Sequence, residues 1–109
     1  MIHRPCRTGQ KLDVAGLNEI IVIIDRSETE LTEVGMNSWA PGLDGPPHAH
    51  EHKEQTLFIL EGAGQFTVAA QTEPAAAGEV VFVPRSASLA VTAGPAGLRL
   101  VSFGTVVRR

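Results

Sequence analysis

The chain has 109 residues, which is the length of one domain with a single hydrophobic core. A net charge of -3 gives no broad positive field for nucleic acid, and the basic residues gather instead near the two ends of the chain, as solvated groups. The single cysteine, Cys6, cannot form an internal disulfide, and the longest aliphatic run, 20–24, is too short to span a membrane. We therefore expect a cytoplasmic protein with neither a membrane nor a nucleic-acid partner.

Short apolar or alternating segments predict β-strands along the chain, and no segment has the period of an amphipathic helix. Residues 1–17 are interpreted as an irregular N-terminal arm with room for one short strand at 11–14, and residues 18–109 as one β-barrel domain. The predicted strands of that domain are 18–25, 30–39, 55–61, 65–70, 78–84, 88–92 and 98–103.

Glycine and proline predict the connections between these strands. Residues 40–47 are typical of a loop, because proline restricts φ and glycine permits turns that other residues avoid. A tight turn at 62–64 would join its flanking strands as a hairpin, and a turn at 93–97 would separate the last two strands. Residues 72–77 are expected to form a loop or an edge segment, since Pro74 disfavours a helix.

The stretch from Gly42 to Gly62 holds three of the four histidines. On a strand, alternate side chains share a face at about 6.6 Å, so His48 and His50 point the same way and can chelate one divalent ion. Gln55 begins the next strand after a polar turn at 51–54 and can bring its amide oxygen to the same side. His52 would lie about 13 Å from His48, too far to share that ion, and we interpret it as a residue of the pocket mouth or of the surrounding shell.

Each of these features also has a simpler interpretation. Histidines in a polar loop are often only solvated, and this interpretation is preferred for His52 and Glu54. Gln55 is equally well explained as a hydrogen-bonded amide of the core. The larger apolar side chains are expected in the core or at an interface, and they are Met36, Trp39, Phe58, Phe66, Phe82 and Phe103.

The spacing of residues in this stretch resembles the first motif of the cupin family. Gly42 is followed by five residues, His48-Ala49-His50, four residues, Gln55, six residues and Gly62. A second match begins at Gly78 and reaches Pro84 after five residues, and the whole resemblance covers residues 30–105. It implies a conical antiparallel β-barrel, also called a double-stranded β-helix or jelly roll, with a metal pocket inside and a homodimeric assembly.

Three positions depart from the cupin pattern. Gln55 stands where the family usually has glutamate, Ser86 where it has glycine, and Leu89 where it has the last histidine. The metal ligands that the resemblance implies are therefore His48, His50 and Gln55, without the imidazole from the facing strand. A divalent ion such as Zn, Ni, Fe or Mn would be held weakly, because one imidazole and one negative charge are missing.

Two hypotheses for function follow from the sequence. In the first, the pocket binds a small organic molecule and a metal held by His48, His50 and Gln55 assists a reaction on it. In the alternative, the protein is a non-catalytic small-ligand-binding or sensor module with little or no bound metal. The missing histidine favours the second hypothesis and the retained His-Ala-His segment favours the first.

Overall fold

The structure is a computed structural model and describes residues 1–14 and 18–107. This part of the chain contains strands and no helix, and so no helix that could cross a membrane. The strands are β1 (Gln10–Val14), β2 (Asn18–Ile24), β3 (Thr32–Trp39), β4 (Lys53–Val68), β5 (Gln71–Ala76), β6 (Val80–Val83) and β7 (Leu89–Val106). The short strand expected at 11–14 is β1, while residues 15–17 of the predicted arm and 108–109 of the predicted barrel domain lie outside the described residues.

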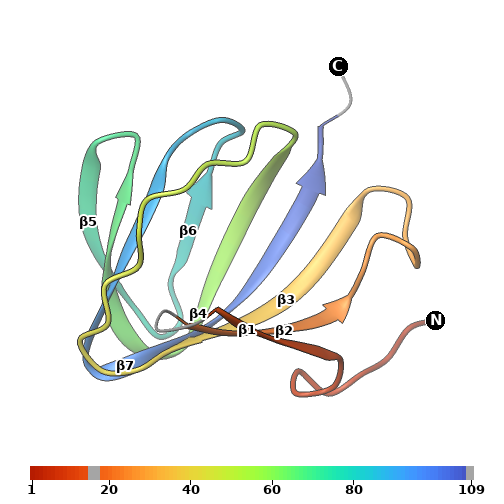
Figure 1. Cartoon of the computed structure of the whole chain (residues 1–109), viewed down its shortest axis with the longest axis horizontal. Coiled ribbons are helices and arrows are strands. Elements are labelled where there is room, and N and C mark those ends of the chain that lie inside the picture. Colours follow the sequence, from red (N-terminus) through yellow and green to blue (C-terminus); the bar gives the residue numbers. More distant parts are fainter. Residues whose placement is uncertain (15–17, 108–109) are drawn as a thin grey trace.

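All seven strands belong to one antiparallel sheet in the order β1-β2-β3-β7-β4-β5, and β6 also pairs with β4. Figure 1 shows this sheet bent back on itself, with β5 and the start of β7 on one side and the strands β1 to β3 leading away from the other. The predicted all-β fold, an antiparallel β-barrel of the jelly-roll type, is confirmed. Bending brings the two inner faces together and encloses the core between them.

Two of the predicted turns are wrong, because the residues assigned to them lie inside long strands. Residues 55–61 and 65–68 do not form a hairpin but belong to the single strand β4, and residues 89–92 and 98–103 belong to β7. These two strands pair with each other over almost their whole length. The glycine-rich segments mark places where the pairing register shifts, between Ile59 and Glu61 and between Gly62 and Gly64.

Gly62 and Gly97 explain why glycine occurs at the bend of the two long strands. Their φ angles are 77° and 82°, which residues with a β-carbon rarely adopt. A β-carbon on Gly62 would also lie 2.1 Å from the backbone oxygen of Gly97, so any side chain there would force the two strands apart. Glycine is required at this point by a bend inside paired strands, rather than by a turn that ends them.

The predicted edge segment at 72–77 is confirmed as β5, which lies at one end of the strand order. Ala69 and Ala70 make the turn between β4 and β5, with φ angles of 49° and 70°. Two-residue hairpin turns with positive φ usually contain asparagine or glycine, which explains why the alanine pair gave no turn signal in the sequence.

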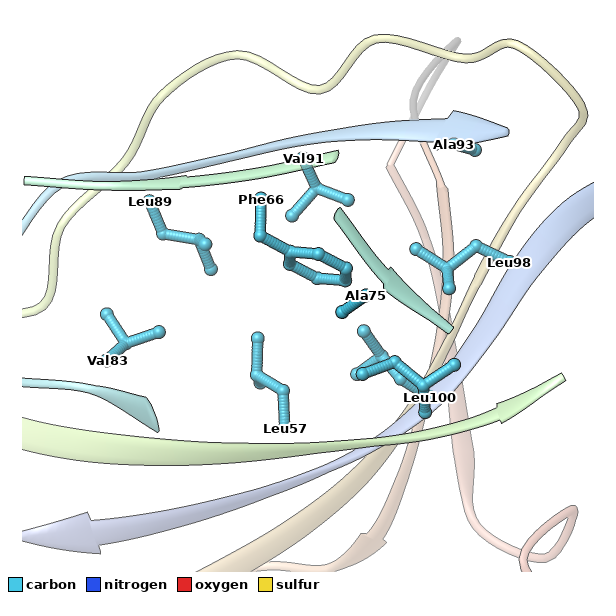
Figure 2. Close-up of a cluster of buried hydrophobic side chains, with 10 residues drawn as sticks. Leu57, Phe66, Ala75, Val83, Leu89, Val91, Ala93, Leu98 and Leu100 are labelled. Carbon is cyan, nitrogen blue, oxygen red and sulfur yellow. The ribbon is translucent and has the colours of Figure 1, made fainter. Parts of the chain in front are cut away.

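The main core lies between the two layers of the bent sheet. Figure 2 shows the Phe66 ring at the centre of a cluster of aliphatic side chains from β4, β5, β6 and β7. Ile59 and Leu100 are its most deeply buried large side chains. The residues of this cluster are Leu57, Ile59, Phe66, Ala75, Val83, Leu89, Val91, Ala93, Leu98 and Leu100. A second cluster of Ile21, Ile23 and Met36 joins β2 to β3.

The N-terminal segment is attached to the barrel through Arg4, which the sequence had suggested was only a solvated cation. Its guanidinium donates to both carboxylate oxygens of Glu28 and, at 2.7 Å, to the backbone oxygen of Ile23. The hydrogen bond from Arg4 is the main cause that lowers the pKa of Glu28 to about 2. The pair therefore stays ionised throughout the range in which most proteins are folded.

Apolar side chains are exposed on the outer face of strands β4, β6 and β7. Thr56 pairs with both Phe82 and Phe103, and Phe58 pairs with Val80, so these side chains point away from the core. Val80, Phe82 and Phe103 are exposed to 58%, 50% and 43%. We call Phe58, Val80, Phe82 and Phe103 the outer apolar face, and it is the surface that we propose for the homodimer expected from the sequence.

Light scattering should find a particle of about twice the 11.6 kDa chain mass at micromolar concentration. Replacing Phe82 with Asp should give a monomer, because a charge cannot be buried in the centre of an apolar contact without a partner. Leu31→Asp is the matched control, since Leu31 is exposed but lies outside the outer apolar face. A wild-type protein that is only monomeric, or a Phe82→Asp variant that remains dimeric, would contradict this assignment.

Candidate ligand cavity and metal site

A cavity of about 450 Å³ lies on the concave face of the bent sheet, next to the main core. Its walls combine strands β2, β3, β4 and β7 with the connection between β3 and β4. Most of the wall is apolar, and the main contributors are Ile20, Val22, Leu57, Leu89, Val91 and Leu100. A concave, mainly apolar site of this size, with a few polar groups, is typical of pockets for small organic molecules.

All three sequence-predicted ligands, His48, His50 and Gln55, line this cavity. Gln55 lies on β4, whereas the histidines lie in the connection before it, which is not the regular strand that the sequence argument assumed. His48 instead forms an isolated bridge with Leu89, in which the two backbones exchange hydrogen bonds of 3.0 and 2.7 Å. The backbone NH of Ser86 also donates to the oxygen of His50 at 2.8 Å, so the start of β7 and the turn before it hold the His-Ala-His segment.

The two imidazole rings lie close together. Their centroids are 5.3 Å apart and their planes meet at 81°. Burial lowers the pKa of His50, and the positive charge of Lys53 lowers it further. His50 is therefore neutral at pH 7 and has a ring nitrogen available to accept a hydrogen bond or to bind a metal.

The other histidine and the acidic residue of the motif have different positions. His52 is exposed, and its backbone oxygen accepts a hydrogen bond of 2.8 Å from Val107. Glu54 pairs with Thr105, and it alternates with Gln55 along β4 so that its side chain faces away from the cavity. Neither is among the described residues that line the cavity; the exposure of His52 agrees with its interpretation as a solvated side chain, whereas Glu54 is half-buried.

The donors in the cavity do not make a complete catalytic metal centre. Among the described residues, no group of three or more His, Cys, Asp and Glu side chains is arranged to hold a metal ion. Catalytic zinc sites usually present three protein ligands, whereas this wall offers two imidazoles and the neutral amide of Gln55. Leu89, 5% exposed, stands directly opposite His48 and fills the place of a further ligand with an apolar side chain. No reaction step is therefore assigned to a metal.

Sequence reasoning missed two charged residues of the cavity, Glu33 and Lys53. Their side chains form an ion pair, with Lys53 Nζ donating to Glu33 Oε1. Lys53 had been assigned to a polar turn, but it is the first residue of β4 and shares a face with Gln55 and Leu57. The alternation of residues 53, 55 and 57 could have revealed it, had the start of the strand been placed correctly. Trp39 lines the cavity and is also packed, partly buried, against the main core.

Ser86 keeps a conformation that glycine adopts more easily. Its φ angle is 69°, in the left-handed region where a β-carbon is unfavourable. This explains why the cupin pattern has a glycine at this position. Ser86 adopts the same left-handed conformation, so the replacement of glycine by serine does not require a different path of the chain. The strained residue still donates its backbone NH to His50, so it helps to hold one of the two cavity histidines in place.

Comparison with known proteins places the chain beside one family. A family model described as "Cupin domain" matches residues 36–102. A comparison with curated protein sequences gave no significant match.

Three solved structures illustrate the likeness in fold. A predicted oxalate decarboxylase from Thermotoga maritima superposes with a TM-score of 0.84 at 18% identity, covering 98% of this chain and 100% of that one. The polyketide cyclase RemF from Streptomyces resistomycificus has a TM-score of 0.79 at 23% identity, covering 96% and 80%. KdgF from a Halomonas species has a TM-score of 0.79 at 16% identity, covering 91% and 87%. At these identities the likeness shows the fold alone, and the two names that describe an activity, a decarboxylase and a cyclase, describe different ones.

Replacing Ser86 with Gly should stabilise the protein by about 0.5–1 kcal/mol, because relief of the left-handed strain exceeds the entropy that glycine adds to the unfolded chain. Chemical denaturation measures this difference. Ser88→Gly is the matched control, since Ser88 is also exposed but has no positive φ, and it should destabilise the protein. Equal losses of stability in the two variants would show that Ser86 is not strained.

Proposed function

Because the chain belongs to the cupin-domain family, we propose that its function is to bind a small organic molecule in the barrel cavity. The observation that carries this proposal is the cavity of about 450 Å³, whose walls are mainly apolar and include a few polar groups. Apolar walls supply affinity by removing ligand surface from water, and polar groups orient the ligand. The proposal needs no metal and assigns no reaction, so it holds equally for a sensor module and for an enzyme.

Two small residues of β3 and β7, Gly35 and Ser102, form part of the cavity wall. Gly35 pairs with Ser102, and both line the cavity, so two small residues lie side by side on its wall. Ser102 donates a long hydrogen bond of 3.4 Å to the backbone oxygen of Gly35, and Asn37 donates to Ser102 at the same distance. The inner wall therefore carries a second polar group, separate from the histidines, that a ligand can contact.

A screen of small aromatic amides and alcohols by NMR should find binders. Protein spectra should show them as shifts of the Trp39 indole signal, because Trp39 is the single tryptophan and lines the cavity. Val22→Trp should weaken binding by roughly tenfold or more, because the larger side chain fills the cavity. Val107→Trp is the control, since Val107 is not among the described lining residues. Ligands whose binding is unaffected by Val22→Trp, or a screen without binders, would argue against the cavity as the functional site.

A weak metal site at His48, His50 and Gln55 remains a second proposal, supported by the closeness of the two imidazole rings. The rings can face one small cation, since each zinc–nitrogen bond spans only about 2.0–2.1 Å. The set has no carboxylate and no third imidazole, so we expect binding to be much weaker than at a complete site. This ion would be bound without being required for the ligand.

Calorimetric titration with Zn²⁺ should show weak binding to the wild-type protein that His48→Ala or His50→Ala abolishes and Gln55→Ala reduces. Leu89→His should strengthen binding by roughly tenfold or more, because residue 89 stands opposite His48 and a histidine there adds a ligand. Binding should weaken as the pH falls, because protonation of His50 competes with the metal, and the lowered pKa of His50 moves this loss to more acidic pH. His52→Ala is the control and should change nothing. If neither the wild-type protein nor the Leu89→His variant binds zinc at millimolar concentration, this site is excluded.

A further inference from the structure

The ion pair between Glu33 and Lys53 places a positive and a negative group together on the cavity wall. Glu33 comes from β3 and Lys53 from β4, and β7 lies between these two strands in the sheet. Both side chains are only partly exposed, at 33% for Glu33 and 22% for Lys53. The contact therefore spans a neighbouring strand, in a place where water screens the charges less than at an open surface.

Gly104 makes this contact possible. Glu33 and Gln55 both pair with Gly104, one from each side of β7, so the three residues form a single row across the sheet. A β-carbon on Gly104 would lie 3.0 Å from Cγ of Glu33 and 3.2 Å from its Oε1. The Glu33 side chain thus occupies the space above Gly104 and reaches across β7 toward β4, where Lys53 lies on the same face as Gln55.

The pair determines the net charge of the cavity. Glu33, His48, His50 and Lys53 are the ionisable side chains among the described lining residues. The Lys53 ammonium and the Glu33 carboxylate contact each other on this wall, so Glu33 already neutralises the positive charge of Lys53. A ligand carboxylate would set two anions against one ammonium in a partly desolvated site, which is unfavourable. A neutral ligand oxygen can accept a hydrogen bond from Lys53 without displacing Glu33.

We propose that Glu33 sets the charge preference of the cavity, so that it accepts neutral ligands carrying a carbonyl or hydroxyl oxygen for Lys53 and rejects carboxylates. This inference rests on the proposed function, because it requires that the cavity binds a small organic molecule. Glu33 and Lys53 are then specificity-determining residues, and Gly104 is a positioning residue that acts through Glu33.

The test compares two probes of nearly the same shape, para-toluamide and para-toluate, by calorimetry at pH 7. The wild-type protein should bind the amide more tightly by about tenfold or more. Glu33→Gln keeps the shape of the side chain but leaves Lys53 without its anion, so the preference should reverse in favour of the carboxylate. Gly104→Ala should move the preference in the same direction but less far, because it displaces the Glu33 side chain.

Two further variants separate this effect from a general change in charge or stability. Adding Lys53→Met to Glu33→Gln should remove the gained affinity for the carboxylate. Glu61→Gln removes the partner of Arg99 at a site away from the cavity, changes the net charge by the same amount, and should leave both affinities unaltered. Thermal denaturation of each variant confirms that it is folded at the temperature of the titration.

The outcomes distinguish this inference from the proposal on which it rests. If the wild-type protein binds both probes and Glu33→Gln does not change the ratio of their affinities, the inference is wrong and the cavity remains a ligand site. A wild-type protein that prefers the carboxylate would likewise overturn it. If neither probe binds to the wild-type protein or to Glu33→Gln, both the inference and the proposed function fail.

Discussion

The pairing of β4 with β7 is the constraint on which the rest of this structure depends. The two strands are hydrogen-bonded from Lys53–Val106 at one end to Val68–Leu89 at the other, and they bend together where Gly62 meets Gly97. Because they stay paired through the bend, one sheet supplies both layers of the barrel. Their side chains also make most of the core, with Phe66 of β4 in one cluster with the leucines and Val91 of β7 (Figure 2). A straight pair of strands would have left one face of this sheet without a partner.

The cavity is a consequence of the same arrangement. The first residues of β7 hold the connection that carries His48 and His50, through the bridge at Leu89 and the bond between Gly45 and Val91. The last residues of β7 carry Gly104, over which Glu33 reaches toward Lys53. One strand therefore positions both the histidine pair and the ion pair. The chemistry of the cavity then depends on a few side chains, since Leu89 makes the wall opposite His48 apolar where a histidine would favour a metal.

Local patterns predicted the type of structure better than they predicted where strands end. The β-branched residues of β2 and the short apolar run of β6 were found correctly, because each is bounded by turn residues. The long strands were each divided in two, since glycine is ambiguous between a turn and a bend in a sheet. The hairpin at Ala69 and Ala70 was missed for the opposite reason, because alanine carries no turn signal even though φ is positive at both residues.

The sequence by itself determined the all-β fold, the family resemblance and the three cavity residues His48, His50 and Gln55, because these depend on residue types at fixed spacing. Only the tertiary structure decided that Glu33 and Lys53 meet in the same cavity. They are 20 positions apart on strands that are not neighbours, and their contact depends on the small size of Gly104 between them. Such a contact follows from strand order and register, which local sequence patterns do not specify.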